Sequence, residues 1–469
     1  MSRLPACCLA AAVLAGCVSL APHYQRPAQP TPATWPTGAA YPPAAAEAAP
    51  MVGWRAFFTD PRLNAVIGQA LANNRDLRVA VANIAIARAQ YQIQRSQLLP
   101  TLNAQAGATL GRQPLGVAGG SAGSSGHVNE HQFNAGLGVS AYELDLFGRQ
   151  RSLSNAAFEQ YLASDQARRA AQITLVAQVA SAWLSLGADR ALLTIAEDTA
   201  ASTDKSLGLT QARFSGGIAS QLDVSQATTL DEQARFDVAR LTTQAAQDIN
   251  ALDLLVGAPV ADALLPAGVE DHPVIADLPA GVSSAVLLQR PDVLQAEDQL
   301  KADNADIGAA RAAFFPTLSL TGSGGVASTA LSMLFSGGSG AWLFTPLISV
   351  PIFDAGRNRA GLASARATRD LGQAQYEKAI QTAFREVADA LAQRGTIGDQ
   401  LAAQRGLTRA ADIALQLADA RYRDGVAGYL DVLIAQRTDY AARQTLVAAE
   451  LAQSTNLVTL YTALGGGLD

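Results

Sequence analysis

Residues 212–224 read ARFSGGIASQLDV, and residues 420–432 read ARYRDGVAGYLDV. The two stretches align without a gap and share Ala-Arg, an aromatic residue, a glycine, a β-branched residue, an alanine and Leu-Asp-Val. Gly217 and Gly425 take the same place in each stretch, and glycine readily adopts the positive φ that ends a helix. We therefore predict that each stretch is a turn between two helices and that the chain is a tandem repeat.

The repeat extends well beyond these turns. Residues 99–102 (LPTL) match residues 315–318 (FPTL), and residues 147–149 (FGR) stand where residues 355–357 (AGR) stand in the second copy. Each copy thus reads helix, Pro-Thr-Leu, a Gly/Ser-rich region, Gly-Arg, a long helix, a Gly turn and a helix. The predicted organisation is a signal peptide (1–16), a Pro-rich strap (17–58), repeat 1 (59–256), an equatorial linker (257–284) and repeat 2 (285–469).

Two tracts without proline predict unusually long helices, over residues 149–214 and 357–423. Apolar residues recur along one stripe of each tract, as in helices that pack in a coiled-coil manner. A helix of about 65 residues is about 100 Å long. Because charges recur throughout both tracts, we expect them to span an aqueous gap rather than the core of a bilayer. The stripes contain Val179, Leu186, Leu193, Ala200 and Leu207 in the first tract, and Ile380, Phe384, Val387 and Leu391 in the second.

Shorter helices precede both Pro-Thr-Leu segments. Asp60-Pro61 suits a helix start, with aspartate as N-cap and proline at the first helical position. Apolar residues at 3–4 spacing then predict one helix from Pro61 that ends before Pro100. In the second copy we predict a helix from about Pro291 that ends before Pro316.

Between the Pro-Thr-Leu and Gly-Arg segments the hydrophobic period changes to two, which predicts β-strands. One apolar and one polar face over about ten residues is what a membrane β-strand requires, although a hairpin on a soluble core alternates in the same way. Gly/Ser-rich loops from Ala118 and Ser336 would connect the strands, and the return strand around Trp342 to Ile352 alternates poorly. The alternating pairs are Leu102, Ala104, Ala106 and Leu110 against Thr101, Asn103, Gln105 and Thr109; Leu318 and Leu320 against Thr317, Ser319, Thr321 and Ser323; and Tyr142, Leu144 and Leu146 against Glu143 and Asp145.

Two hairpins supply four strands, which are too few to close a membrane barrel. An open sheet edge in lipid leaves backbone groups unpaired, at several kcal/mol for each group. If the strands lie in a membrane, several copies of the chain must therefore share one barrel. The strand count by itself does not give the number of copies.

The composition excludes several functions. A net charge of −6 over 469 residues leaves no basic patch, so nucleic acid is not an expected partner. No run of about 18 apolar residues follows the N-terminal segment, so no transmembrane helix is indicated. His127 and His131 fall in a Gly/Ser loop, and none of the four histidines has a zinc-ligand spacing. We expect no catalytic activity, no cofactor and no metal.

The N-terminus is a targeting signal. Arg3, a short apolar run and the sequence Leu14-Ala15-Gly16-Cys17 resemble a bacterial lipobox, in which cleavage before Cys17 exposes it for lipidation. Cys7 and Cys8 would leave with the signal peptide, so no intrachain disulfide is possible. Acyl chains on Cys17 would anchor the chain in a membrane. The Pro-rich strap that follows is predicted to lie extended along a surface.

Together these features resemble the outer membrane factor family: the TolC-like channels of the lipoprotein branch (NodT- and OprM-like) that serve RND-type multidrug efflux systems. The resemblance covers essentially the whole chain and depends on the order and spacing of its motifs. The matching segments are the lipobox, the PHYQRP segment at 22–27, the RPDV segment at 290–293, the FPTL segment at 315–318, the paired turns and the LGGG segment at 464–467.

The resemblance implies a mostly helical, tandem-repeat protomer with four transmembrane strands. Three copies would close a twelve-stranded barrel in the outer membrane, continued by a tunnel of long coiled-coil helices through the periplasm. A periplasmic adaptor, also called a membrane fusion protein, and an inner-membrane RND-type pump would dock at the far end. Val18 after Cys17 favours the outer membrane, because related lipoproteins kept at the inner membrane usually carry Asp there.

The resemblance also assigns roles at the turns. Gly217 and Gly425 would lie at the periplasmic tip, where adaptors dock. Related channels are constricted by a leucine and, one helical turn later, an aspartate; these positions match Leu430 and Ile434, so this chain departs from the pattern. The constriction is then either more hydrophobic and gated by dewetting, or Asp431 supplies the charge.

Other residues of the turns are explained by capping or by gating. Ser220 and Asp223 have the spacing of a capping box, and Asp431 holds the place of Asp223 in the second copy, so both aspartates can serve as helix caps. Tyr422 and Arg423 match residues that hold related tips shut, although Arg423 also suits a helix C-terminus as a solvated charge. The first copy has Phe214 and Ser215 instead, which would let one helix pair move more than the other.

The leading hypothesis is a passive exit duct for drugs or other small toxic solutes in a tripartite efflux pump. One alternative is a type I-like secretion channel or a metal-ion export channel; only Met51 and Met333 remain after signal cleavage, which disfavours a methionine-lined copper path. The other is a periplasmic coiled-coil lipoprotein scaffold without a pore, which would have no use for paired amphipathic strands.

Overall fold

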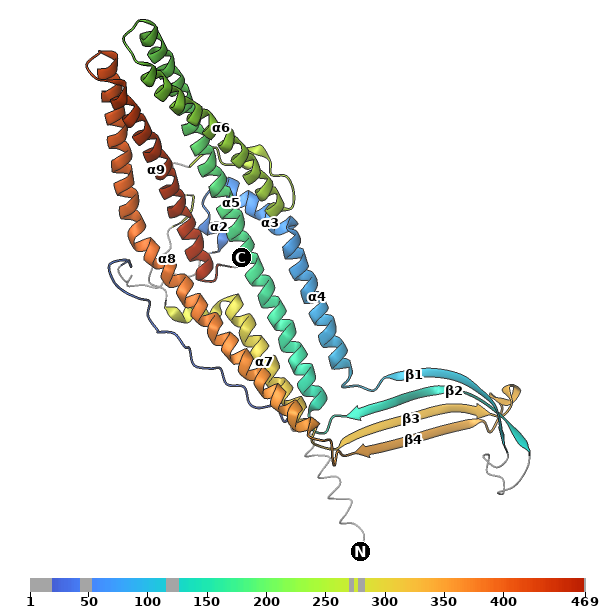
Figure 1. The fold of residues 1–469 in the computed structure, drawn as a ribbon. Helices are drawn as coiled ribbons and strands as arrows, with labels where there is room; N and C mark the ends of the chain where they lie inside the picture. Colours follow the sequence, from blue (N-terminus) through green and yellow to red (C-terminus); the bar gives the residue numbers. More distant parts are fainter. Residues whose placement is uncertain (1–18, 43–52, 115–125, 270–273, 277–282, 468–469) are drawn as a thin grey trace. The chain divides into compact units, whose positions relative to one another are not determined.

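A computed structural model describes residues 19–42, 53–114, 126–269, 274–276 and 283–467 (Figure 1). The predicted signal peptide, Cys17 and most of the loop from Ala118 lie outside these ranges. The chain divides into two compact units. The sheet unit contains the described parts of 1–27, 85–163 and 297–375, and the helical unit contains the described parts of 28–84, 164–296 and 376–469.

The order of elements repeats, as the duplicated motifs predict. Helix, hairpin, long helix and helix follow one another twice along the chain (Figure 1). The predicted long helices are confirmed: each contains 67 residues, and their bounds agree with the proline-free tracts to within one residue. The first copy consists of α4 (Arg75–Ser96), β1, β2, α5 (Arg149–Ser215) and α6 (Gln221–Val256), and the second of α7 (Pro291–Ala312), β3, β4, α8 (Arg357–Arg423) and α9 (Tyr429–Ala463).

The prediction of a single helix from Pro61 is wrong, because the chain breaks at Asn74. Asp60 caps α3 (Pro61–Asn73) as expected, but Asn74 has an extended backbone and ends that helix. The Asn74 side chain accepts a hydrogen bond from the Leu77 amide at 2.8 Å and donates one to the Leu255 carbonyl at 2.8 Å. Asn74 therefore caps the following helix α4 and also binds the end of α6, a distant partner that apolar spacing cannot reveal.

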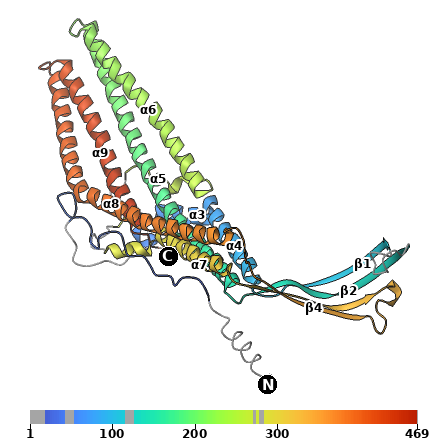
Figure 2. The ribbon, with the colours of Figure 1, turned by 60° about the horizontal axis from the view of Figure 1, so that its bottom comes forward.

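The strands form one antiparallel sheet in the order β1-β2-β3-β4, with β1 and β4 at its two edges (Figures 1 and 2). Leu102 pairs with Val139, Val139 with Gly322, and Gly322 with Phe344, so one row crosses all four strands. An irregularity between Val139 and Tyr142 places Ala141 at φ 51°, and its amide donates to Thr321 Oγ1 at 3.2 Å. The bounds are β1 Leu102–Pro114, β2 His127–Leu144, β3 Thr317–Ser328 and β4 Gly340–Ser349.

The pairing register sorts the side chains onto an apolar face and a polar face, as the alternation predicts. The apolar positions of β1 run over nine residues, from Leu102 to Leu110, which is about the length of a membrane β-strand. β4 departs from the alternation, because Leu343 and Leu347 lie on the polar face. The apolar face carries Leu102, Ala104, Ala106, Ala108 and Leu110 of β1, Phe133, Ala135, Leu137 and Val139 of β2, Leu318, Leu320 and Val326 of β3, and Trp342, Phe344, Pro346 and Ile348 of β4.

The interpretation of His127 and His131 as loop residues is wrong, since both lie in β2. His131 pairs with Leu110 and His127 with Pro114, beyond the last row that β2 shares with β3. The polar composition of this segment resembles a loop, and only the ladder with β1 shows that the strand continues. Both side chains are exposed.

The core of the helical unit is aromatic. The Phe57 ring stacks on Tyr461 with ring centroids 4.4 Å apart, and Trp183 donates to the Leu264 carbonyl at 2.9 Å. Among the described residues, α5 alone contains an 18-residue window apolar enough to cross a membrane, and 44% of that window is buried within the protein. The remaining short helices are α2 (Trp54–Phe57), η1 (Asp262–Leu264), η2 (Ser284–Gln289) and, in the sheet unit, η3 (Leu331–Met333).

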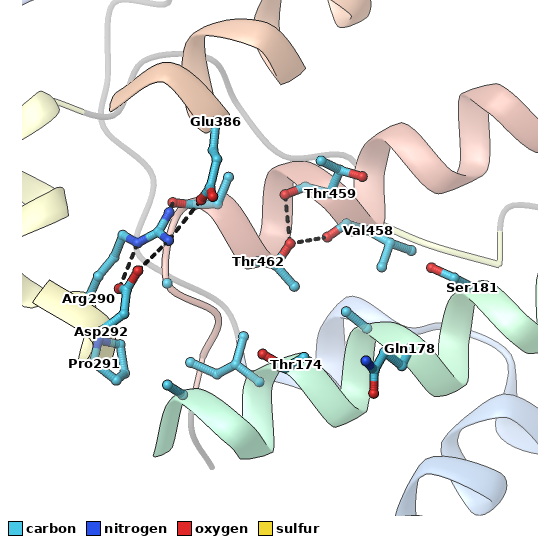
Figure 3. Close-up of a pocket in the computed structure, with 15 residues that line it drawn as sticks. Thr174, Gln178, Ser181, Arg290, Pro291, Asp292, Glu386, Val458, Thr459 and Thr462 are labelled. Carbon is cyan, nitrogen blue, oxygen red and sulfur yellow. Dashed lines mark hydrogen bonds and ion pairs between the residues drawn. The ribbon is translucent and has the colours of Figure 1, made fainter. Parts of the chain in front are cut away.

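Arg290 of the RPDV segment joins three helices of the helical unit at a cleft of about 600 Å³ (Figure 3). Its guanidinium binds Asp292 through two hydrogen bonds of 2.8 and 3.0 Å, pairs with Glu386 of α8 at 2.9 Å and donates to the carbonyl of Ala463, the last residue of α9. Burial lowers the pKa of Arg290, but the hydrogen bonds and charges of Asp292 and Glu386 outweigh it and raise the pKa above its ordinary value. Gly465 makes room for the arginine, because a Cβ there would lie 3.1 Å from Arg290 Cγ.

Candidate functional site

The duplicated turns have the same backbone. Gly217 has φ 75° and Gly425 has φ 74°, so the predicted positive φ is confirmed at both. In each turn the residue after this glycine donates to a carbonyl five residues back: Ile218 to Arg213 and Val426 to Arg421, both at 2.9 Å. This is the Schellman arrangement, which satisfies the last carbonyls of the long helix. The repeated sequence therefore ends α5 and α8 in the same way.

The helices that follow the turns begin differently. The predicted capping box is confirmed in the first copy: the Ser220 hydroxyl accepts from the Asp223 amide at 3.2 Å, and the Ser220 amide donates to Asp223 Oδ2 at 2.8 Å. In the second copy the N-cap is Gly428, which has no side chain to complete a box. Asp431 is exposed in the first turn of α9, where the helix dipole stabilises its negative charge.

Arg213 connects the two hairpins, a contact that the sequence analysis missed. Its Cζ lies 4.1 Å from the centroid of the Tyr422 ring, and its Nη2 donates to the carbonyls of Tyr422 and Arg423 at 3.0 and 3.4 Å. These carbonyls are at the C-terminus of α8, where a cation is favourable. Arg213 is the repeat equivalent of Arg421, so the alignment of the two copies pointed to the position but not to its partner.

Tyr422 belongs to a small buried cluster at these turns. It is 5% exposed and packs with Tyr429, Val432 and Leu433 of α9 and with Leu230 of α6. Burial, with smaller contributions from Tyr422 and Asp223, raises the pKa of Tyr429 to about 12. The cluster holds the α5/α6 and α8/α9 hairpins together near their ends.

Arg423, Leu430 and Ile434 lie on the outside of this cluster. Arg423 forms an ion pair with Asp419, one turn earlier on α8, at 2.7 Å, and its side chain is 69% exposed. Leu430 and Ile434 are 54% and 56% exposed and lie one turn apart on α9. Leu430 and Ile434, at the two positions that the family resemblance assigns to a constriction, therefore share one exposed face of the helix, away from the buried Tyr429 and Leu433.

We predict that Arg213→Ala loosens the contact between the hairpins. A cation–π contact of about 0.5–2 kcal/mol and two carbonyl hydrogen bonds are lost, so amide exchange in the last turn of α8 should rise about tenfold. Hydrogen–deuterium exchange of the peptide that covers Tyr422 to Val426, in the detergent-solubilised protein, measures this change. Arg421→Ala, at the exposed equivalent position, is the matched control. Equal exchange in the two variants would contradict the prediction.

Comparison with known proteins agrees with the fold. The chain is 48% identical over 458 residues to a probable efflux pump outer membrane protein, TtgC of Pseudomonas putida, covering 97% of this chain and 93% of that protein. It is 44% identical over 471 residues to the outer membrane protein OprJ of Pseudomonas aeruginosa, covering 100% and 97%. The open-state structure of the Neisseria gonorrhoeae MtrE outer membrane channel superposes with a TM-score of 0.85 at 38% identity, covering 96% and 98%.

The fold is that of outer membrane channels built from a β-barrel and a helical tunnel. The family model described as "Outer membrane efflux protein" matches residues 66–258 and 282–466. The chain therefore belongs to the outer membrane efflux protein family. The two matched segments fall one in each copy of the repeat.

Proposed function

We propose that three copies of this chain form a passive exit duct for a tripartite efflux pump, with a twelve-stranded barrel in the outer membrane. The observation that carries this proposal is the sheet, which is apolar on one face and, among the described residues, has β1 and β4 at its edges. Unpaired edges are costly in lipid, and pairing β4 of one copy with β1 of the next removes them. A scaffold without a pore would not need this sheet.

The exposed apolar pair of Leu430 and Ile434 supports a constriction at the periplasmic end of the duct. Three copies would place six apolar side chains around the axis, with Asp431 beside them supplying negative charge. A narrow apolar passage excludes water and ions until it widens. We infer that the turns at Gly217 and Gly425 dock a periplasmic adaptor, which links the duct to an inner-membrane RND-type pump.

The cargo and the anchor are also part of the proposal. Relatives are named as antibiotic and toluene efflux pump components, so we propose antibiotics and small organic solvents as exported solutes. Acyl chains on Cys17 would fasten the chain to the outer membrane. In support, strap residues close to Cys17 bind α7: Arg311 donates to the Leu20 carbonyl at 2.9 Å.

Three measurements test this function together. The purified protein should migrate as a heat-labile trimer in mild denaturing gels and should give discrete single-channel currents in a planar bilayer. A deletion strain should become more susceptible to a panel of antibiotics and to toluene, and the wild-type gene should restore resistance. A monomeric protein without conductance would contradict the duct, and conductance without any solute phenotype would contradict the cargo.

A further inference from the structure

The apolar face of the sheet contains a groove of about 450 Å³ that is lined by residues of all four strands. Gly322 and Gly324 form its floor, at successive apolar-face positions of β3, and Leu137 and Phe344 are among its walls. A Cβ added at Gly324 would meet nothing within 4 Å, and one at Gly322 would meet its nearest neighbour at 3.7 Å. These two glycines therefore leave open volume instead of permitting a close contact within the protein.

Two glycines on the polar face of the same sheet, Gly136 and Gly325, have a different role. A Cβ at Gly136 would lie 2.7 Å from the Gly324 carbonyl oxygen, and one at Gly325 would lie 2.2 Å from the Ala135 carbonyl oxygen. Glycine is needed there so that β2 and β3 can approach each other. No close approach of strands requires glycine at Gly322 or Gly324 in the groove on the apolar face. The volume of the groove falls within the range of ligand pockets, about 300–1,000 Å³.

The groove lies at the helix-proximal end of the sheet and has one polar end. Pro100 and Leu102, which follow α4, line it together with Tyr142. The Tyr142 hydroxyl donates to the Leu98 carbonyl at 2.9 Å, while its ring faces the apolar lining. An aromatic ring with its polar tip at one end of an apolar surface is typical of a membrane–water interface. An apolar lining with one polar end suits a hydrocarbon chain that enters from the interface.

The strap runs antiparallel to α7 within the sheet unit. Arg26 binds the buried Glu297 at 2.7 and 2.9 Å, near the N-terminal side of α7, and Asn304 donates to the Pro22 carbonyl at 2.8 Å. Arg311 donates to the Leu20 carbonyl at 2.9 Å, near the C-terminal end of α7. The strap therefore leads toward the N-terminus in the direction of the strands.

The described end of the strap packs directly against α7 at Ala21. A Cβ at Gly308 would lie 2.7 Å from the Ala21 amide nitrogen, so this glycine lets the strap press directly against α7. Cys17 is three residues before Leu20, and three extended residues reach at most about 10 Å. A lipid on Cys17 is therefore tethered within about 10 Å of Leu20, which Arg311 binds near the C-terminal end of α7.

We propose that this groove binds an acyl chain of the lipid attached to Cys17. The proposal rests on the lipid anchoring stated under the proposed function. Because the acyl chain is tethered within about 10 Å of Leu20, its local concentration around the sheet unit exceeds that of any one untethered phospholipid chain. The occupied groove would hold the strap against the barrel wall and complete the apolar surface over Gly322 and Gly324.

Photo-cross-linking of the full-length protein in cells tests this proposal. Cells are fed a palmitate analogue with a diazirine in its chain and a terminal alkyne, illuminated, and the purified protein is digested and analysed by mass spectrometry. We expect the N-terminal lipopeptide that begins at Cys17 to be joined to peptides of β2, β3 or β4 that line the groove. Gly324→Leu should remove most of this product, since its side chain would occupy the floor of the groove and a Cβ there meets nothing within 4 Å.

Gly111→Leu is the matched control, because a Cβ at Gly111 also meets nothing within 4 Å but lies on the polar face of the sheet. This variant should leave the cross-link unchanged. The proposal would be overturned if the acylated lipopeptide were joined only to phospholipid or to segments outside the groove. It would also be overturned if, in the wild type, the strands of the groove were joined to bulk phospholipid. An N-terminal peptide without any acyl label would overturn the anchoring as well, whereas the channel function is decided separately by conductance.

Discussion

A channel that carries Leu430→Ala and Ile434→Ala together should conduct severalfold more current than the wild type at the same voltage. Both side chains are more than half exposed in the protomer and lie on one face of α9. If they form the apolar constriction, truncation widens it and makes it easier to hydrate. Burial of one methylene group is worth about 0.8 kcal/mol. If the free-energy barrier to ion passage through the constriction falls by that amount, the current rises about fourfold. Single-channel recording measures the increase, and higher uptake of large antibiotics should accompany it.

The control for this prediction is the double variant Ile413→Ala and Leu417→Ala. These residues also lie one turn apart and are 51% and 61% exposed, but on α8, before the turn. The same loss of apolar surface there should leave the current unchanged. Ile434→Asp adds a further readout, because three carboxylates at the constriction should increase preference for cations. Equal currents in both double variants would place Leu430 and Ile434 away from the constriction.

Arg290→Ala should lower the free energy of unfolding by about 2–4 kcal/mol. The substitution removes hydrogen bonds to Asp292 and to the end of α9 together with the ion pair to Glu386. The arginine is 7% exposed, whereas the side chains of both carboxylates are at least 40% exposed and can be rehydrated, which limits the loss. Urea unfolding of the detergent-solubilised protein, followed by the helical circular dichroism signal, measures the difference.

Arg385→Ala is the matched control, one residue from Glu386. Its ion pair with Asp389 is 3.9 Å long between side chains that are 72% and 75% exposed, so its removal should change stability very little. Arg290→Lys keeps the charge but cannot form the two-pronged contact with Asp292, and should fall between the wild type and Arg290→Ala. An Arg290→Ala protein as stable as the Arg385→Ala protein would show that Arg290 does not hold the three helices together.

Much of the fold could be predicted because it depends on interactions between residues close in sequence. The absence of proline and the helix formers defined α5 and α8 almost to the residue, and Gly217 and Gly425 defined their ends. The capping box of Ser220 and Asp223 involves a separation of only three residues. Period-two alternation identified the faces of β1 and β3, since neighbouring side chains on a strand point to opposite faces.

The failures share a physical cause. Asn74 breaks a continuous apolar pattern because its side chain finds a partner on α6, and His127 belongs to a strand because β1 pairs with it. Sequence resemblance pointed to Tyr422 and Arg423 at the turns, but their packing against Arg213 depends on how two hairpins meet. The contacts of Asn74 and Arg213 join residues 181 and 209 positions apart, and no local pattern specifies them.

The amino-acid sequence by itself determined the duplicated architecture, the lengths of the long helices, their glycine ends and the two-faced strands, because backbone propensity and side-chain periodicity act within a few residues. Only the tertiary structure decided which distant segments come into contact. It placed the guanidinium of Arg213 on Tyr422, joined three helices at Arg290 and left an open groove above Gly322 and Gly324. These features arise when distant segments pack, and whether a glycine leaves a space or closes one depends on the neighbour that packing brings to it.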